Sequence, residues 1–217
     1  MRQFPGLVNT KLIIIVCLLT LATGLGVYLG GRAGNQPGTR IEGLLWPDPI
    51  TIEPFAVLDQ HGASFTESSL QGKWSLLFFG YTHCPDICPL TLSVIKQVYE
   101  QLAQAGMAED VQVLFATVDP ERDTLGKLSG YLAYFNPDFI GLGGTVEQIQ
   151  NLTQRLGAIS MRGETDKAGG YLVDHTAAVF LIDPKGRLLS IYSPPHTSAA
   201  MLSRLANIRS FISENER

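Results

Sequence analysis

Two cysteines, Cys84 and Cys88, lie close together in the segment Gly-Tyr-Thr-His-Cys-Pro-Asp-Ile-Cys-Pro at residues 80–89. The chain has 3 cysteines in all, and the third, Cys17, lies in an apolar N-terminal stretch where we interpret it as a small apolar residue in lipid. Two thiols at this spacing can close a disulfide or bind a soft metal ion. The spacing alone leaves metal binding and redox exchange equally open.

Pro89 indicates how the pair is presented. Proline suits the first turn of a helix, where the backbone N–H that it lacks would be unpaired in any case. We therefore expect a helix to begin at Pro89, with Cys88 at its cap and Cys84 in the loop before it. The amino end of a helix stabilises negative charge, so it favours the thiolate, which is both a nucleophile and a metal ligand.

The spacing of the cysteines argues against three familiar classes of site. Thioredoxin-type reductases have two residues between their cysteines, and this chain has three. Thiol peroxidases place a threonine three residues before the cysteine, whereas Thr82 is two before Cys84. Structural zinc sites need four protein ligands, and the sequence contains no second cysteine pair.

A third ligand favours a metal site. His175 lies just before the apolar run 177–182. In a thioredoxin-like sheet the loop entering that strand lies beside the cysteine loop, although a histidine before a strand is, without this context, more often a capping or surface residue. Two thiolates and one imidazole suit copper, because the donor set is soft enough for Cu(I) and contains the nitrogen that Cu(II) prefers.

The other histidines are weaker candidates. His83 adjoins Cys84, and an adjacent side chain tends to point away from its neighbour. His61 has the position of a hairpin-turn residue, and His196 follows two prolines in a loop. We expect none of the three to bind the metal.

Apolar patterns predict the elements that must position these residues. Strands are expected at 55–58, 64–66, 74–79, 111–118, 139–142, 177–182 and 188–192, and helices at 90–105, 125–135, 146–156 and 198–212. Thr145 and Gln148 have the spacing of a capping box at the third helix. This order predicts an α/β fold with a thioredoxin-like central sheet flanked by helices. The cysteines then follow a central strand at its carboxyl end, where open α/β sheets bind ligands.

The amino-terminal part is predicted to lie outside this domain. Residues 12–29 carry no charged side chain, so we expect a single transmembrane anchor at 12–30, preceded by a short tail at 1–11. A Gly- and Pro-rich tether at 31–50 then leads to the domain at 51–217. The positive-inside bias is slight, but a cytoplasmic tail with the domain on the exported side is the simplest arrangement. Cysteines can be oxidised or metallated on that side.

The charge of the chain excludes one class of partner. Residues 33–217 contain 13 of the 16 lysines and arginines and all 20 aspartates and glutamates, which gives a net charge of −7. An acidic domain without basic runs argues against nucleic acid as a partner.

Three separated segments carry a family resemblance. They are residues 80–89, the run Thr-Val-Asp-Pro-Glu-Arg-Asp-Thr at 117–124, and Asp-His-Thr at 174–176 leading into Leu-Ile-Asp-Pro at 181–184 with Gly186. Together they resemble the Sco/SenC family over roughly residues 50 to 213. The resemblance implies a membrane-anchored, thioredoxin-like copper protein that assists the assembly of cytochrome c oxidase. It also implies that Cys84, Cys88 and His175 are the copper ligands.

Several acidic and aromatic residues lie near the cysteines or in the matching segments. Asp119 matches the Asp-Pro of the family, and it either tunes the site as a hydrogen-bond acceptor or caps the loop that it begins. Asp86, between the cysteines, is interpreted as a solvated carboxylate. Tyr81 and Phe79 are interpreted as core and rim packing.

Two functions from different classes follow. The first is a metallochaperone that passes copper to the binuclear copper centre of cytochrome c oxidase subunit II or to another copper-receiving protein. The second is a thiol–disulfide reductase that keeps cysteines of an exported oxidase subunit reduced for metallation, and it would use Cys84 and Cys88 without His175. A copper or redox sensor is a third reading, for which the sequence shows no output partner. We predict a binding protein rather than an enzyme unless the dithiol exchanges disulfides.

Overall fold

The computed structural model describes residue 14 and residues 18–25 and 43–216. Residues 18–25 are helical. No helix among the described residues is both long enough and apolar enough to cross a membrane. The predicted tail, most of the predicted anchor and the first part of the predicted tether lie outside the described residues, so these segments stay predictions.

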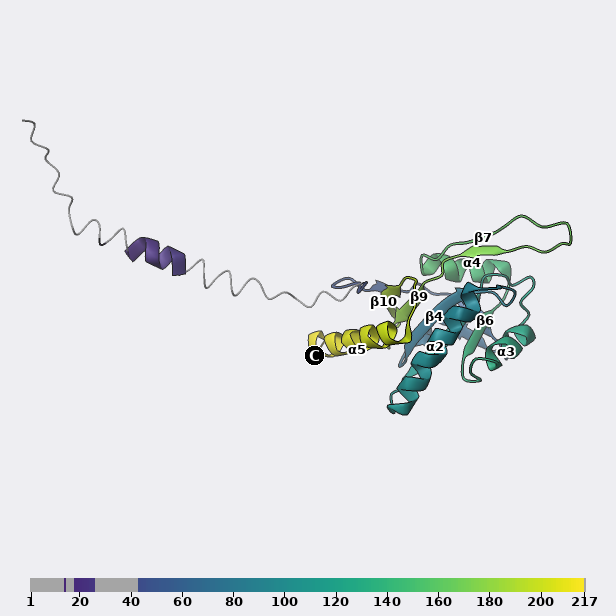
Figure 1. Ribbon diagram of the computed structural model, residues 1–217, viewed down its shortest axis with the longest axis horizontal. Helices are drawn as coiled ribbons and strands as arrows, with labels where there is room; N and C mark the ends of the chain where they lie inside the picture. The colour runs from purple at the N-terminus through teal and green to yellow at the C-terminus, as the bar shows by residue number, and fades with distance from the viewer. Residues whose placement is uncertain (1–13, 15–17, 26–42, 217) are drawn as a thin grey trace, which may run out of the picture. The chain divides into compact units, whose positions relative to one another are not determined.

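The domain is built on an eight-stranded sheet with the strand order β1-β10-β9-β4-β5-β6-β2-β3. Figure 1 labels β10, β9, β4 and β6 of this sheet. Its strands are β1 (Ile50–Thr51), β2 (Ala56–Asp59), β3 (Ser64–Thr66), β4 (Trp74–Gly80), β5 (Val111–Thr117), β6 (Ile140–Gly143), β9 (Val179–Ile182) and β10 (Arg187–Tyr192). The three central strands β4, β5 and β6 run parallel, and β9 pairs antiparallel with β4. A separate two-stranded sheet joins β7 (Ser160–Arg162) to β8 (Val173–His175).

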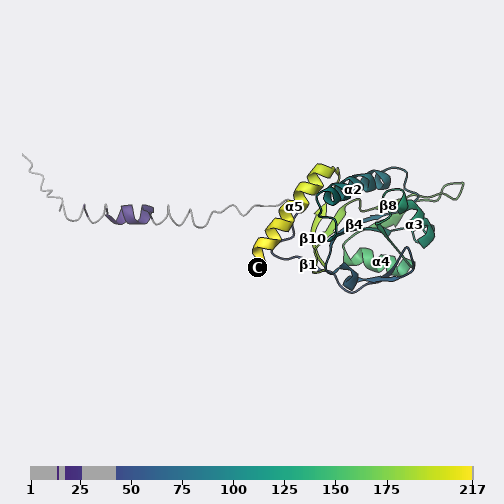
Figure 2. The same ribbon diagram turned by 90° about the horizontal axis from the view of Figure 1, so that it is seen from below.

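Helices cover both faces of the large sheet. They are α2 (Ile87–Gln104), α3 (Leu125–Ala133), α4 (Val146–Arg155) and α5 (Ser198–Asn215), with a 3₁₀ turn η1 (Glu67–Leu70) after β3. Figure 2 shows α2 and α5 on one face of the sheet and α4 on the other. The predicted α/β architecture, a central sheet flanked by helices, is therefore confirmed.

Strand β4 leads into the cysteine loop and is buried along its whole length. Side chains alternate across a strand, so Leu76 and Phe78 pack into the core beneath α2 and α5, while Leu77 and Phe79 pack into the core beneath α4. A strand covered on both faces has no polar face, which explains the continuous apolar run in the sequence. The end of β4 is thus a rigid platform for the loop that follows.

Helix α2 begins earlier than the sequence predicted. It starts at Ile87 with Asp86 as its N-cap, so Cys88 lies in the first turn and Pro89 is the third helical residue. The first four N–H groups of a helix have no intrahelical partner, so proline costs no hydrogen bond at any of these positions. The predicted start at Pro89 was therefore wrong by two residues, and Cys88 is not the cap.

The β7–β8 hairpin was not predicted. Its strands have three residues each, and several of these are exposed, so they lack the apolar run or alternation that identifies a strand. Ser160 pairs with His175, and Arg162 pairs with Val173. His175 therefore ends a strand, rather than lying in a loop as predicted.

The capping box at α4 was predicted correctly. The Thr145 hydroxyl accepts a hydrogen bond from the backbone N–H of Gln148 at 3.3 Å. The Gln148 side-chain oxygen accepts one from the backbone N–H of Thr145 at 2.8 Å. Two otherwise unpaired donors are satisfied, which fixes where the helix begins.

The last turn of α5 is held by an ionic cluster, which generates a pH-dependent prediction. Glu216 accepts hydrogen bonds from Lys185 and, at 2.7 Å, from Arg187, and these contacts hold the pKa of its carboxyl below the ordinary value. Because the folded-state pKa is lowered, the stabilisation is present above the ordinary Glu pKa of 4.5 and is lost as the pH falls through the folded value. We expect Glu216→Gln to lower the free energy of unfolding near neutral pH by at most about 1 kcal/mol, since the cluster is partly solvated.

Chemical denaturation at neutral and acidic pH checks this. The difference between wild type and Glu216→Gln should shrink toward zero in acid. Glu214→Gln on the same helix is the matched control, because Glu214 accepts a hydrogen bond from Ser210 rather than from a cation. A difference that persists unchanged in acid would contradict the prediction.

Candidate metal centre

The structure brings Cys84, Cys88 and His175 together. One ligand atom from each residue lies within 4.8 Å of the others. Within the described part of the chain, these three side chains form a cluster that could hold a metal ion. The Cys88 sulfur is 3.4 Å from Nε2 of His175. Both cysteines are free thiols. The prediction that His175 lies beside the cysteine pair is confirmed.

The cysteine loop turns back on itself at the end of β4. The backbone N–H of Cys84 donates to the carbonyl of Tyr81 at 3.2 Å, which closes a turn. The backbone N–H of Cys88, in the first turn of α2, donates to the Cys84 sulfur at 3.5 Å. This contact directs the Cys84 sulfur to the amino end of helix α2.

The two thiols differ in their surroundings. Cys84 is half-buried, whereas Cys88 is fully buried. Burial, followed by the hydrogen bond to Cys84, raises the pKa of the Cys88 thiol far above its ordinary value. In the metal-free protein Cys88 is therefore a neutral thiol near pH 7. A metal ion would displace its proton and supply the positive charge that a buried thiolate requires.

His175 is oriented to offer Nε2. Its Nδ1 lies 3.2 Å from the carbonyl oxygen of Thr176, and because a carbonyl can only accept, Nδ1 carries the proton. The Nε2 lone pair then faces the Cys88 sulfur. Burial lowers the pKa of the imidazole, which keeps it neutral and able to coordinate. The rings of Tyr81 and Phe78 contact it edge-to-face, at centroid distances of 5.9 and 6.0 Å.

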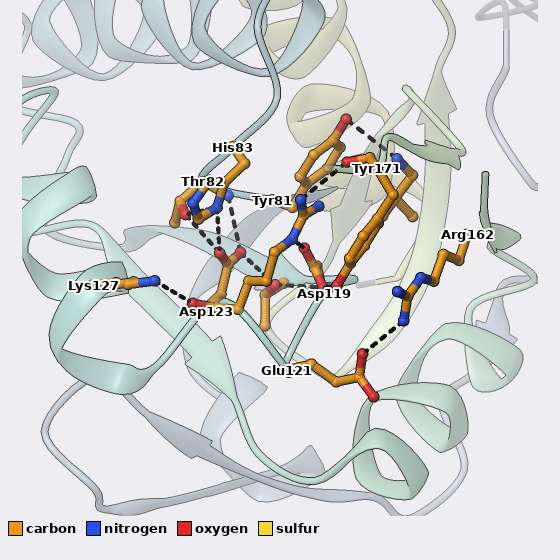
Figure 3. A network of polar contacts seen from close by, with 12 residues as sticks. Tyr81, Thr82, His83, Asp119, Glu121, Asp123, Lys127, Arg162 and Tyr171 are labelled. Atoms are coloured by element: carbon orange, nitrogen blue, oxygen red, sulfur yellow. Dashed lines mark hydrogen bonds and ion pairs between the residues drawn. The ribbon is translucent and has the colours of Figure 1, made fainter. Parts of the chain in front are cut away.

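Asp123 supports the cysteine loop, and the sequence analysis missed it. Its buried carboxylate accepts hydrogen bonds from the backbone N–H of Thr82 at 2.9 Å, from the Thr82 hydroxyl at 2.5 Å and from the Thr117 hydroxyl at 2.7 Å (Figure 3). Thr82 is two residues before Cys84. The sequence offered no signal beyond an acidic residue among several, because the contact joins segments 41 residues apart.

Asp119 contacts the β7–β8 hairpin, which ends in His175. One carboxylate oxygen accepts a hydrogen bond from the Tyr171 hydroxyl at 2.7 Å, and the other forms an ion pair with Arg122 (Figure 3). Its backbone carbonyl accepts hydrogen bonds from the N–H groups of Arg122 and Asp123. Asp119 therefore closes the turn that it begins, which is one of the two roles expected from the sequence. It also contacts Tyr171, in the loop that leads to His175, and the expected role in tuning the site stays a prediction.

The remaining sequence candidates lie outside the cluster. His61 is exposed in the β2–β3 turn, and His196 lies 2.9 Å from the carbonyl of Ala177. The Nδ1 atom of His83 is 3.1 Å from the Thr82 hydroxyl and 3.6 Å from Asp123. Asp86 is the exposed N-cap of α2.

Known proteins share this fold and sequence pattern. The sequence model described as SCO1/SenC matches residues 47–210. The chain belongs to the SCO1/SenC family. It is 37% identical over 194 residues to the mitochondrial SCO2 homolog of Bos taurus, an alignment that covers 88% of this chain and 71% of that one.

Solved Sco structures agree with this fold. The structure of Arabidopsis thaliana ScoI with copper bound has a TM-score of 0.68 and 34% identity, over 73% of this chain and 98% of that one. Bradyrhizobium japonicum ScoI with copper bound has a TM-score of 0.65 and 35% identity, over 74% and 99%. The Sco/SenC resemblance expected from the three sequence segments is confirmed.

Gly80 is required where the strand meets the site, which gives a second prediction. A Cβ at this position would lie 2.7 Å from the Phe115 ring and 3.0 Å from the Cys88 sulfur. We expect Gly80→Ala to destabilise the protein by about 1–3 kcal/mol through overpacking. The displaced sulfur should also change the rate at which Cys88 reacts with a thiol reagent.

Denaturation and thiol-labelling kinetics measure the two effects. Gly126→Ala in α3 is the matched control, because a Cβ there meets no atom within 4 Å. A Gly80→Ala protein with wild-type stability and labelling would show that the close approach is unimportant.

Proposed function

We propose that this protein is a membrane-anchored copper metallochaperone that binds copper through Cys84, Cys88 and His175. In this proposal it helps to assemble the binuclear copper centre of cytochrome c oxidase. The observation that carries the proposal is the convergence of two thiols and a neutral imidazole within 4.8 Å. The copper bound to solved Sco proteins of the same fold supports it.

The donor set suits copper. Thiolates select soft cations such as Cu(I), and the imidazole also accommodates Cu(II). Closed structural zinc sites take four protein ligands, whereas the described residues provide three at this cluster. Cys84 is less buried than Cys88. In this proposal a copper-receiving protein approaches on the side of Cys84 and exchanges ligands one at a time.

The anchor and location belong to the same proposal. The apolar segment 12–30 would hold the protein in the membrane, and residues 31–50 would tether the domain on the exported side, the bacterial periplasm or its equivalent. Subunit II of cytochrome c oxidase, or another copper-receiving protein on that side, is the proposed recipient.

Substitution of the ligands tests copper binding. The reduced wild-type protein, titrated anaerobically with Cu(I) and with Cu(II), should saturate at about one equivalent, as expected for a single set of three ligands. The Cu(II) form should show an intense sulfur-to-copper absorption band. Cys84→Ser and His175→Ala each remove a proposed ligand. We expect each to weaken copper affinity by more than about tenfold, since even residues that only orient metal ligands contribute about 10–100-fold.

His61→Ala is the matched control, because His61 lies in an exposed turn. It should bind copper as wild type does. Unchanged affinity and stoichiometry in both ligand variants would refute the proposed site.

A second function rests on the unequal exposure of the thiols. The more exposed Cys84 accepts an N–H at the helix start and suits the attacking thiolate, while the buried Cys88 suits the resolving thiol. Cys84 would attack a disulfide of the partner and release one of its thiols. Cys88 would then displace the second, which leaves the partner reduced and Cys84–Cys88 oxidised. An external dithiol reductant must restore the pair.

Disulfide exchange measured with His175→Ala separates the two functions. We expect exchange to persist in this variant while copper binding is lost, because His175 forms no covalent bond in the exchange. Absence of exchange in the wild-type protein would exclude the reductase.

A further inference from the structure

We propose that the turn of residues 119–123, which follows β5, sets the distance between the cysteine pair and His175. It does so through two arms, one to the cysteine loop and one to the β7–β8 hairpin. Asp123, Arg122 and Tyr171 are then positioning residues for the metal site. This inference rests on the proposed copper site and adds how that site is held in shape.

The first arm is the carboxylate of Asp123. It is buried and accepts three hydrogen bonds, two of them from Thr82 and one from Thr117 at the end of β5. The cysteine loop is therefore tied to the neighbouring strand by a group that can only accept. An asparagine at this position would place an NH₂ group among donors and lose at least one of these bonds.

The second arm holds Tyr171 at three points. Its hydroxyl donates to Asp119 at 2.7 Å, its carbonyl accepts from Nη1 of Arg122 at 3.0 Å, and its ring lies under the Arg122 guanidinium with 3.5 Å between the guanidinium carbon and the ring centroid. Arg122 is itself fixed by its ion pair with Asp119.

The other strand of the hairpin is held by the same turn. The guanidinium carbon of Arg162, in β7, lies 3.7 Å from the Tyr171 centroid. Two carbons this close to one centroid cannot share a face of the ring without overlapping, so Tyr171 is enclosed between two guanidinium groups. Arg162 also forms an ion pair at 3.1 Å with Glu121 of the turn (Figure 3).

The second arm fixes the position of His175, because the β7–β8 hairpin that ends in this residue is a separate two-stranded sheet. In the described part of the chain, β8 pairs with β7 and not with the eight-stranded sheet. Its placement therefore depends on side-chain contacts and on the connection to β9. Besides Tyr171, the Tyr81 hydroxyl accepts the backbone N–H of Val173 at 3.3 Å. A shift of Tyr171 would move the strand that ends in His175.

The donor atoms of the three residues lie close together without a metal. One ligand atom of each residue lies within 4.8 Å of the others. The Cys88 sulfur and Nε2 of His175 are already 3.4 Å apart. The two arms thus preorganise the site, so metal binding need not draw the hairpin toward the cysteines.

Conservative variants separate the arms. Tyr171→Phe removes only the hydroxyl contact with Asp119, and Arg122→Lys keeps the charge but loses the planar stack. We expect both to weaken Cu(II) affinity by about tenfold or more and to shift the sulfur-to-copper band, with the reduction potential of the Cys84–Cys88 pair unchanged. Asp123→Asn should change both copper affinity and the reduction potential, because it releases the cysteine loop.

Each variant has a matched control in an exposed or solvated position: Tyr134→Phe, Arg155→Lys and Asp138→Asn. The controls should match wild type in copper affinity, absorption band and reduction potential. If Tyr171→Phe and Arg122→Lys acted only by lowering the stability of the protein, they would change the reduction potential of the Cys84–Cys88 pair together with copper binding. Such a joint change would overturn the inference. So would a wild-type copper affinity and a wild-type sulfur-to-copper band in both variants.

A measurement without metal distinguishes this inference from the proposed function. In the metal-free protein, Tyr171→Phe and Arg122→Lys should speed hydrogen exchange at the amides of Val173 and Thr176 and leave that of Val113 in β5 unchanged. If the wild-type protein binds no copper, the proposed function fails, and this experiment still decides whether the turn holds the hairpin. Unchanged exchange in both variants would overturn the two-armed turn whether or not copper binds.

Discussion

The antiparallel pairing of β4 with β9 is the interaction on which the site depends. Because the strands run in opposite directions, the end of β4 lies beside the start of β9, with Phe78 opposite Val179. The chain leaving β4 carries the cysteines, and the chain approaching β9 carries His175. Buried side chains on both faces of the sheet hold the register of β4 and β9. This register brings Cys88 and His175 together, although they are 87 residues apart in the sequence. No contact within the cysteine loop could achieve this alone.

The site balances burial against charge. Full burial of Cys88 raises the pKa of its thiol, and partial burial of His175 lowers the pKa of its imidazole, so both side chains are neutral in the metal-free protein near pH 7. A soft cation reverses this preference for the cysteines, because it supplies the charge that the interior lacks. Gly80 leaves room for the buried Cys88 sulfur, and Cys84 is less buried than Cys88. In the proposed function, this asymmetry would serve both retention and release of a metal.

The turn after β5 contacts both segments that carry the candidate ligands. It has one aspartate bound to the cysteine loop and another bound to the β7–β8 hairpin. Tyr171, between Arg122 and Arg162, connects that turn to the β7–β8 hairpin, which in the described part of the chain is a separate two-stranded sheet. Asp119 and Asp123 are buried, and hydrogen bonds to buried carboxylates are stronger than those on an exposed surface. In the proposed arrangement these contacts hold the three candidate ligands close together before any ion arrives.

Local sequence determined much of this protein. Continuous apolar runs predicted β4 and β5, and capping residues predicted the start of α4, because each is a pattern of neighbouring residues. The two cysteines are such a pattern as well, whereas His175, 87 residues from Cys88, was placed beside them by the expected fold and the family resemblance. The tertiary structure decided the features that depend on contacts between distant parts of the chain. Pro89 is compatible with several positions in a first helical turn, so only the fold placed Cys88 within it. The hairpin strands are too short to have a period, and Asp123, Arg122 and Tyr171 acquire their roles from partners tens of residues away. Their contacts depend on how the chain closes in space, which residue types and spacing alone do not specify.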